Sequence, residues 1–234
     1  MKLQSLRLFS PLLHLAVIGV SLSSATAATL MNMTFDNGGA NINETTGWNG
    51  TTAPGGSLAT GLAVTTGMQI FGDFTAQNGA DVFHVDGWHT TNSSDTRVGM
   101  TIGALSGYTF SLGGGSETFS TRMHQHPSNA SDMFNSVTLL INGISIGSQS
   151  YTPAGGVQTL SWNIGTNALL DNLTSATFDL KFTGVVNTGN ANHGPEWSLA
   201  DSAFVSFTGS VIPEPSQAVL GCLGLGLVLI RRRR

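Results

Sequence analysis

The amino-acid sequence predicts an all-β fold, an antiparallel β-sandwich of two sheets, and three observations support this. The chain of 234 residues contains 30 glycines but only nine lysines and arginines, so turn-forming residues are plentiful and helix-forming residues are scarce. Short runs of alternating apolar and polar residues recur along it, as half-buried strands require. One such region contains Asn142-Gly143, the preferred sequence of a two-residue hairpin turn.

The alternation defines the predicted strands. It is clearest between Ala176 and Thr183, where Phe178, Leu180 and Phe182 share one face. The last run carries apolar side chains on both faces, which predicts a strand that is covered on both sides. In chain order, the predicted strands are Thr29 to Phe35, Met68 to Phe74, Asp81 to Val85, Thr96 to Ile102, Tyr108 to Leu112, Ser136 to Ile141, Ile144 to Ser150, Val157 to Ile164, Ala176 to Thr183 and Ala203 to Thr208.

Two glycine-containing turns are predicted. Both central positions of a type I′ turn need positive φ, which Asn142-Gly143 supplies between two apolar runs. This hairpin resembles the Val-Asn-Gly hairpin of concanavalin-like and laminin-G-like jelly rolls, which implies a jelly-roll-like sandwich. Gly113-Gly114-Gly115 indicates a looser hairpin loop. We therefore expect Gly143→Val to destabilise the fold more than Gly114→Val, since three glycines can share one bend.

The other segments complete a single predicted domain from Ala28 to Ile212. Residues Gly38 to Gly67 are polar and glycine-rich, which predicts a long loop or an irregular edge, and Asn167 to Asn172 predict a single helical turn. The nearest approach to a linker is the short stretch Gly209 to Ile212.

Residues 1–27 have the order of a secretory signal peptide. Lys2 and Arg7 form a basic region, Leu12 to Leu22 form an apolar core, and the small residues end in Ala25-x-Ala27. We expect cleavage after Ala27 by signal peptidase, following contact with the secretion machinery.

Residues 213–234 form a three-part tail. The motif Pro213-Glu214-Pro215-Ser216 precedes an apolar segment from Gln217 to Ile230, and the chain ends in Arg231, Arg232, Arg233 and Arg234. This tail resembles the C-terminal sorting signal of PEP-CTERM proteins. The resemblance implies a bacterial exported protein that is processed by an exosortase, usually in organisms that make extracellular polysaccharide.

The tail is short for a transmembrane helix. The four arginines are expected to stop transfer on the cytoplasmic side. Ser216 to Ile230 would span roughly 22 Å as a helix, less than the ~30 Å hydrocarbon core. Two interpretations stay open: a transient anchor that is cut near Pro213–Ser216, or an ordinary short anchor. A GPI signal is excluded because it would end in apolar residues.

The charge of the exported region excludes nucleic-acid binding. The whole chain carries −4, but Ala28 to Ile212 contain three basic and twelve acidic residues, a net charge of −9. Such a surface cannot hold phosphate backbones. Cys222, the single cysteine, lies in the tail, so the exported region has no disulfide bond.

Histidines give the candidate metal ligands. His124 and His126 would share a face if they lay on a strand, and with His84 or Asp86 they could hold a metal ion. Turn residues follow them directly, so the interpretation that we adopt is two solvated loop histidines, with no metal and no cofactor.

Enzyme motifs are missing from the sequence. No Gly-x-Ser-x-Gly elbow and no His-Glu-x-x-His motif occurs, and the acidic residues form no closely spaced pattern of glycosidase type. The alternative is a secreted carbohydrate-active enzyme whose site residues are scattered in sequence.

Tryptophans give the candidate sugar contacts. Trp48 and Trp88 lie among turn residues and are the predicted exposed pair, with packing against the core or a lid as the alternative to ligand contact. Trp162 alternates with core residues. The run around Trp197 resembles the one that often precedes the last strand of small sandwiches with such a tail, which implies a structural tryptophan. We therefore predict an exported, non-enzymatic envelope or matrix protein that contacts polysaccharide, with its tail in the membrane before release.

Overall fold

The computed structural model describes residues 27–34, 57–71, 75–79, 82–86, 97–125, 134–151, 156–183, 195–198 and 202–214. These residues form two antiparallel sheets, which confirms the predicted all-β class. The jelly-roll-like arrangement stays a prediction. The predicted signal peptide up to Thr26 and the predicted sorting tail from Pro215 to Arg234 lie outside the described residues. Of the described residues, none belongs to a helix that is long and apolar enough to cross a bilayer.

The larger sheet has nine strands and the smaller sheet has five. The order in the larger sheet is β2-β1-β14-β8-β13-β5-β4, with β11 also paired to β8 and β7 to β14; the order in the smaller sheet is β10-β9-β12-β6-β3. The strands are β1 (Ala28–Thr34), β2 (Ser57–Leu58), β3 (Leu62–Phe71), β4 (Thr75–Gly79), β5 (Val82–Asp86), β6 (Arg97–Ala104), β7 (Tyr108–Ser111), β8 (Thr118–Gln125), β9 (Ser136–Ile141), β10 (Ile144–Ser150), β11 (Gly156–Asn163), β12 (Ser175–Thr183), β13 (Pro195–Ser198) and β14 (Phe204–Pro213), and η2 (Ala168–Leu170) is a 3-10 turn.

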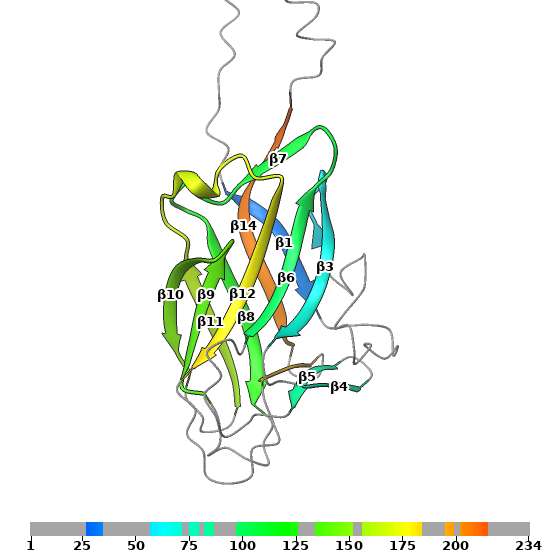
Figure 1. Cartoon of the computed structure of the whole chain (residues 1–234), viewed down its shortest axis with the longest axis vertical. Coiled ribbons are helices and arrows are strands. Elements are labelled where there is room, and N and C mark those ends of the chain that lie inside the picture. Colours follow the sequence, from blue (N-terminus) through cyan, green and yellow to red (C-terminus); the bar gives the residue numbers. More distant parts are fainter. Residues whose placement is uncertain are drawn as a thin grey trace, which may run out of the picture.

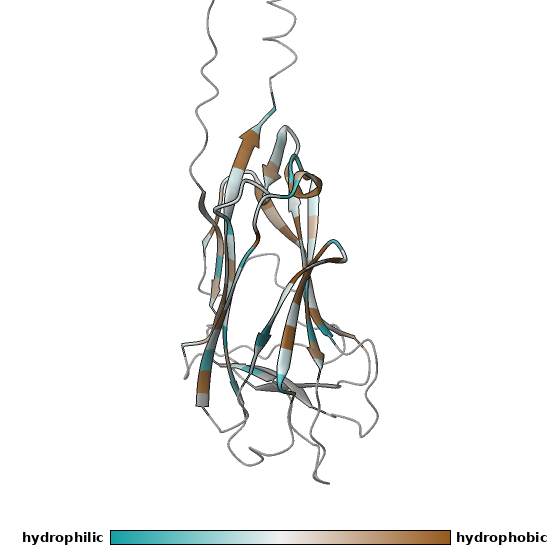
Figure 2. Ribbon diagram, turned by 90° about the vertical axis from the view of Figure 1, so that its left-hand side faces the viewer, coloured by the Kyte–Doolittle hydropathy of each residue, from teal (hydrophilic) through white to brown (hydrophobic). Residues whose placement is uncertain are grey.

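The two sheets stack face to face as two layers. Figure 1 shows the five-stranded sheet in front of the nine-stranded sheet, with β7 and η2 at one end and β4 and β5 at the other. Figure 2 shows the same layers from the side. In β9 and β14, for example, buried and more exposed residues alternate, so one face of each strand lies against the core and the other faces outside.

Aromatic side chains join the layers in the core. Phe178 of β12 stacks on Phe119 and on Phe207 of the opposite sheet, at centroid distances of 5.6 and 4.7 Å. Phe119 also meets Trp162 edge-on at 5.9 Å. A second cluster contains Tyr151, where burial raises the pKa of the hydroxyl. Phe119, Phe178, Phe207 and Trp162 occupy inward-facing positions of their strands, so the apolar period of two directs them into the core.

The predicted strands are present in the structure. β12 buries Ala176, Phe178, Leu180 and Phe182 as the alternation predicted. Asn142 and Gly143 connect β9 to β10 with φ of 52° and 77°, which confirms the tight hairpin. The predicted helical turn is η2, in which Asn167 caps the turn by accepting a hydrogen bond from the Leu169 N–H.

The segment Gly38 to Gly67, predicted as a long loop or an irregular edge, contains β2 and the start of β3, which are edge strands of their sheets. Three other predictions about the chain path were wrong. His124, which was predicted to be a solvated loop residue, lies in β8, a central strand that we did not predict. Gly113–Gly115 is no hairpin loop, because β7 pairs with β14 and β8 pairs with β11. Gly209 to Ile212 is no linker, because β14 continues through it to Pro213.

The pattern of β8 explains why it was missed. Its core-facing residues are Phe119, Thr121 and Met123, so a polar residue interrupts the apolar period. Thr121 is fully buried, donates a hydrogen bond to the Phe204 carbonyl, and accepts one from the indole of Trp197. Both hydrogen-bond partners of Thr121 are about 80 residues away in sequence, so no local pattern shows that this polar residue is buried.

Candidate functional site

The predicted metal ligands are only partly within the structure. His124 lies on the outer face of β8, and its Nδ1 atom is 3.8 Å from Glu196 Oε2 on β13. The register places Glu196 directly opposite both His124 and His84. His126 lies outside the described residues. Within the described part of the chain, no group of three or more His, Cys, Asp or Glu residues is arranged to hold a metal ion.

The two tryptophans within the structure are core residues. Trp162 is 3% exposed and its indole N–H donates to the Gly147 carbonyl at 2.9 Å, which ties β11 to β10 of the opposite sheet. Trp197 is fully buried and donates to Thr121 at 2.9 Å. This confirms their predicted structural roles. The predicted contact residues Trp48 and Trp88 lie outside the described residues.

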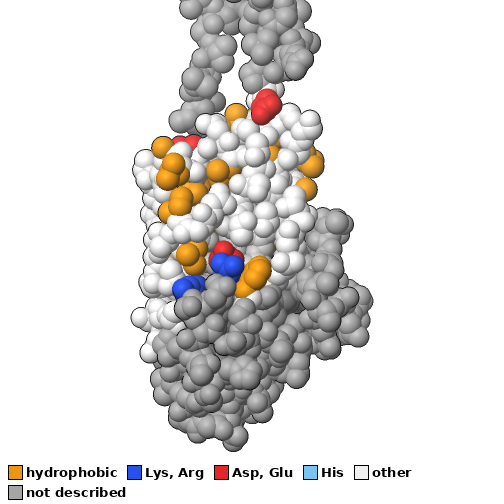
Figure 3. Space-filling view, viewed as in Figure 1, with side chains coloured by type: hydrophobic (Ala, Val, Ile, Leu, Met, Phe, Trp, Pro, Cys, Tyr) orange, Lys and Arg blue, Asp and Glu red, His pale blue; other side chains and the backbone are white. Residues whose placement is uncertain are grey.

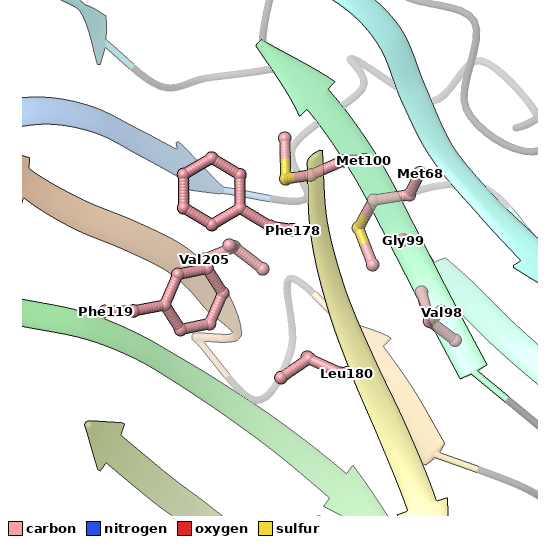
Figure 4. A pocket seen from close by; sticks show the side chains of 8 residues that line it. All are labelled: Met68, Val98, Gly99, Met100, Phe119, Phe178, Leu180 and Val205. Atoms are coloured by element: carbon pink, nitrogen blue, oxygen red, sulfur yellow. The ribbon is translucent and has the colours of Figure 1, made fainter. Parts of the chain in front are cut away.

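A small cavity between the sheets is not a ligand site. Its volume is about 10 Å³, and its lining is apolar, including Met100, Phe119 and Phe178 (Figure 4). A water molecule needs roughly this much space and polar partners as well. The cavity is therefore a packing defect of the core, too small and too apolar for a sugar.

The outer face of the five-stranded sheet carries the most chemically varied group of side chains. One residue from each strand lies in a single cross-strand row, in the order Phe71, Arg97, Lys181, Thr138, Ser148. We call these five residues the charged row. With strands about 4.8 Å apart, the row is roughly 19 Å long.

Arg97 is held in place by contacts on two sides. Its guanidinium lies 4.6 Å from the ring centroid of Phe71 and 3.7 Å from Asp179 Oδ2. The Asp179 side chain is 9% exposed and that of Arg97 is 33% exposed. Gly99 lies on β6 directly opposite Asp179, and a Cβ atom there would overlap the Asp179 carboxylate. The absence of a side chain at Gly99 thus lets the carboxylate lie across β6 beside Arg97.

Hydroxyl groups extend this face on both sides of the charged pair. Thr138 and Ser148 share a hydrogen bond of 2.7 Å, and Thr101 and Thr177 share one of 3.0 Å. Figure 3 views the molecule from this side and shows acidic and basic side chains gathered beside hydrophobic ones on a largely neutral polar face. This face therefore brings together two cations, the Asp179 carboxylate, several hydroxyls and the Phe71 ring, groups that could contact a long polar ligand.

Arg97 and Lys181 lie side by side although basic residues are scarce in this chain. Arg97, Arg122 and Lys181 are the three basic residues between Ala28 and Ile212. Arg97 and Lys181 are directly opposite in the register, whereas Arg122 lies on β8 of the other sheet. Two of the three basic residues between Ala28 and Ile212 therefore lie next to each other on the outer face of the five-stranded sheet.

The start of the predicted sorting motif is part of the sandwich. Pro213 is the last residue of β14 and is paired with Tyr108 of β7. The Glu214 N–H donates to the Gly107 carbonyl at 2.8 Å. Of the predicted signal cleavage residues, Ala27 is described and Ala25 is not; Ser216 and the arginines also lie outside the described residues.

No family model matches the chain, and no curated protein matches it. Several solved structures are distantly similar to it, among them the following two. The CBM36-1 domain of a multidomain xylanase from the hindgut metagenome of Trinervitermes trinervoides is similar with 16% identity and a TM-score of 0.31, over 63% of this chain and 92% of that one. A structure described as "CBM4 structure and function" is similar with 11% identity and a TM-score of 0.30, over 63% and 78%. Neither likeness assigns a ligand to this chain.

The charged row was missed in the sequence although part of the signal was present. The alternation of β12 already placed Asp179 and Lys181 on one face, away from the core. Arg97 and Phe71 join them only through pairing between β12, β6 and β3, which are far apart in sequence. The scarcity of basic residues was the remaining signal. With only three of them between Ala28 and Ile212, the position of each is informative.

Proposed function

We propose that this chain is an exported, non-catalytic protein of the cell envelope or extracellular matrix, and that its sandwich contacts acidic polysaccharide through the charged row. The observation that carries the proposal is the pairing of Arg97 and Lys181 on the outer face of the five-stranded sheet. Both side chains are partly exposed, and hydroxyls of Thr138 and Ser148 continue the same row.

The chemistry of the row suits an acidic sugar chain. A guanidinium binds carboxylates through paired hydrogen bonds, and an ammonium adds a compact positive charge. Phe71 and Asp179 already hold the guanidinium of Arg97 in place. Ligand binding would therefore restrict fewer rotatable bonds than it would in a freely moving arginine. The net charge of −9 over the exported region disfavours contact elsewhere on the surface, so the row directs the ligand to one place.

Delivery is proposed to depend on the two terminal segments. Residues 1–27 would direct export, and residues 213–234 would hold the chain in the membrane until an exosortase-type enzyme cuts near Pro213–Ser216. Because Pro213 is paired with Tyr108 at the end of β14, only three residues separate the sandwich from the apolar segment that the sequence predicts.

Affinity electrophoresis of the full chain tests polysaccharide binding. We expect alginate in the gel to retard the protein, dextran to have little effect, and added salt to weaken the retardation, because exposed charges are screened. Lys181→Ala should lose most of the retardation. Arg122→Ala is the matched control, since it removes the same charge from the other sheet. Equal behaviour of the two variants, or no retardation by any acidic polysaccharide, would overturn the proposed contact.

Intact mass of the mature protein tests the delivery proposal separately. We expect a species that begins after Ala27 and ends close to Ser216 in the native host. A mature species that still contains Arg231 to Arg234 would count against exosortase processing.

A further inference from the structure

The end of the sandwich from which β14 leaves carries three exposed aliphatic side chains. Among the described residues, the large hydrophobic side chains that are exposed are Leu105 at 50%, Leu169 at 73% and Ile212 at 38%. Leu105 lies between β6 and β7, Leu169 lies in η2, and Ile212 lies near the end of β14. We call these three residues the apolar end.

β7 connects the three residues of the apolar end. Ile212 is paired with Thr109 of β7. The Leu105 carbonyl accepts a hydrogen bond from Tyr108 at the start of β7, and the Leu112 N–H just after β7 donates to Leu170 of η2. Figure 1 shows β7, η2 and the end of β14 together at the same end of the molecule. The exposed aliphatic side chains therefore belong to one end of the sandwich.

The membrane segment predicted from the sequence begins immediately beyond this end. Glu214 is fixed to the Gly107 carbonyl by a 2.8 Å hydrogen bond. The predicted apolar segment starts at Gln217, so at most about 11 Å of extended chain separates it from Glu214. The interfacial layer on one side of a bilayer is about 5 to 8 Å thick. An inserted tail would consequently hold the apolar end at the membrane surface.

The short length of the tail strengthens this effect. An apolar helix of roughly 22 Å in a hydrocarbon core of ~30 Å can lower its mismatch by drawing its flanking residues inward. Since only three residues lie between β14 and the predicted apolar segment, the sandwich would be drawn toward the membrane with them. Aliphatic side chains at that end would then lie at the boundary between headgroups and acyl chains, where their burial is favourable.

Charge does not provide an alternative attraction at this end. Asp171 closes η2 and Glu214 follows β14, and both are acidic. The described basic residue nearest in sequence to Leu105 is Arg97, eight residues away along β6, which is about 26 Å in an extended strand. Contact with a bilayer would therefore depend on apolar burial and not on anionic lipids.

We propose that the apolar end rests in the interfacial layer of the membrane while the C-terminal tail is inserted. This inference rests on the proposed membrane delivery through the tail. In this orientation the strands run away from the bilayer, and the charged row lies about 26 Å farther out than Leu105. The sheet face that contacts polysaccharide then stays clear of the membrane.

Single-cysteine labels on the full chain test the orientation in phosphatidylcholine vesicles. In a Cys222→Ser background, an environment-sensitive fluorophore is attached at Leu105→Cys or at Leu169→Cys. The matched control is Thr183→Cys, an exposed position eight residues along β12 from Ser175 and therefore at its other end. A fourth protein carries the label on the native Cys222, which reports insertion of the tail.

The expected result is a blue shift of the emission at positions 105 and 169, with loss of fluorescence when spin-labelled lipid is present. The label at position 183 should keep the emission that it has in water. Phosphatidylglycerol and salt should leave these shifts unchanged. If Cys222 reports insertion while positions 105 and 169 stay in water, the inference is overturned and the delivery proposal stands. If Cys222 also stays in water, both are overturned.

Discussion

The turn at Asn142-Gly143 and the segment Gly113–Gly115 both join strands through glycine, yet the glycines meet different requirements. Gly143 has φ of 77°, and a Cβ atom there would have no heavy atom within 4 Å. At Gly113, in contrast, a Cβ atom would overlap the Asn167 carbonyl oxygen, and at Gly114 it would lie 2.5 Å from Glu117 Oε1. Gly143 is required by local backbone conformation, whereas Gly113 and Gly114 are required by close neighbours.

This difference changes the expected order of glycine substitutions. From sequence, three consecutive glycines predict a tolerant loop and Asn142-Gly143 predicts a strict turn. In the structure Gly113 is buried, it accepts a hydrogen bond from the Asn167 N–H, and Gly114 forms a bridge with Thr166. Crowding against backbone is harder to relieve than an unfavourable φ, because the partner segment has to move as well. Alanine substitutions, which add only a Cβ atom, separate the two effects.

Gly113→Ala should have the largest effect, a loss of about 3 kcal/mol in the free energy of unfolding. The new Cβ would displace the Asn167 carbonyl, which accepts the Leu170 N–H within η2. Urea denaturation of the full chain measures the loss, and far-ultraviolet circular dichroism checks that the sheets remain. A loss no greater than that of Gly143→Ala would contradict the close contact between Gly113 and η2.

Gly114→Ala should cost about 2 kcal/mol. Its Cβ would crowd Glu117, whose carboxylate is buried and accepts the Ser116 N–H at 2.9 Å. A double-mutant cycle with Glu117→Ala isolates this contact, since shortening Glu117 removes the atom that the new methyl would meet. We expect a coupling of about 1 kcal/mol, and additive losses would show that Glu117 does not set the requirement at position 114.

The same distinction between local and distant causes explains how much of the molecule the sequence predicted. β12 and the Asn142-Gly143 hairpin were predicted because their signals lie within a few residues. β8 was not, because buried Thr121 is explained only by its hydrogen bonds to Phe204 and Trp197, which are distant in sequence. The charged row depends on the register between β3, β6 and β12, and no local pattern of Arg97 contains that register.

Gly143→Ala should cost between about 1 and 2 kcal/mol, the usual penalty of a left-handed conformation for a residue with a Cβ atom. The surroundings add nothing, because the space around position 143 is open. Gly143→Val should cost somewhat more, since its branched side chain restricts the backbone further. Thermal unfolding of both variants at equal concentration gives the comparison. An unchanged melting temperature in both would mean that position 143 tolerates positive φ without glycine.

Asn142→Gly should have the smallest effect, about 1 kcal/mol or less, and it tests whether this turn is purely local. Glycine adopts the φ of 52° without strain, so the backbone requirement of the turn remains satisfied. What is lost is the Asn142 side-chain oxygen, which accepts the Thr177 N–H of β12 at 2.8 Å. Asn142→Asp is the matched control, because it keeps an acceptor at the same position. If Asn142→Gly and Asn142→Asp unfold at the same urea concentration as the unaltered chain, the turn depends on φ alone. A loss confined to Asn142→Gly would show that even this hairpin, the most local feature of the fold, is anchored to a neighbouring strand.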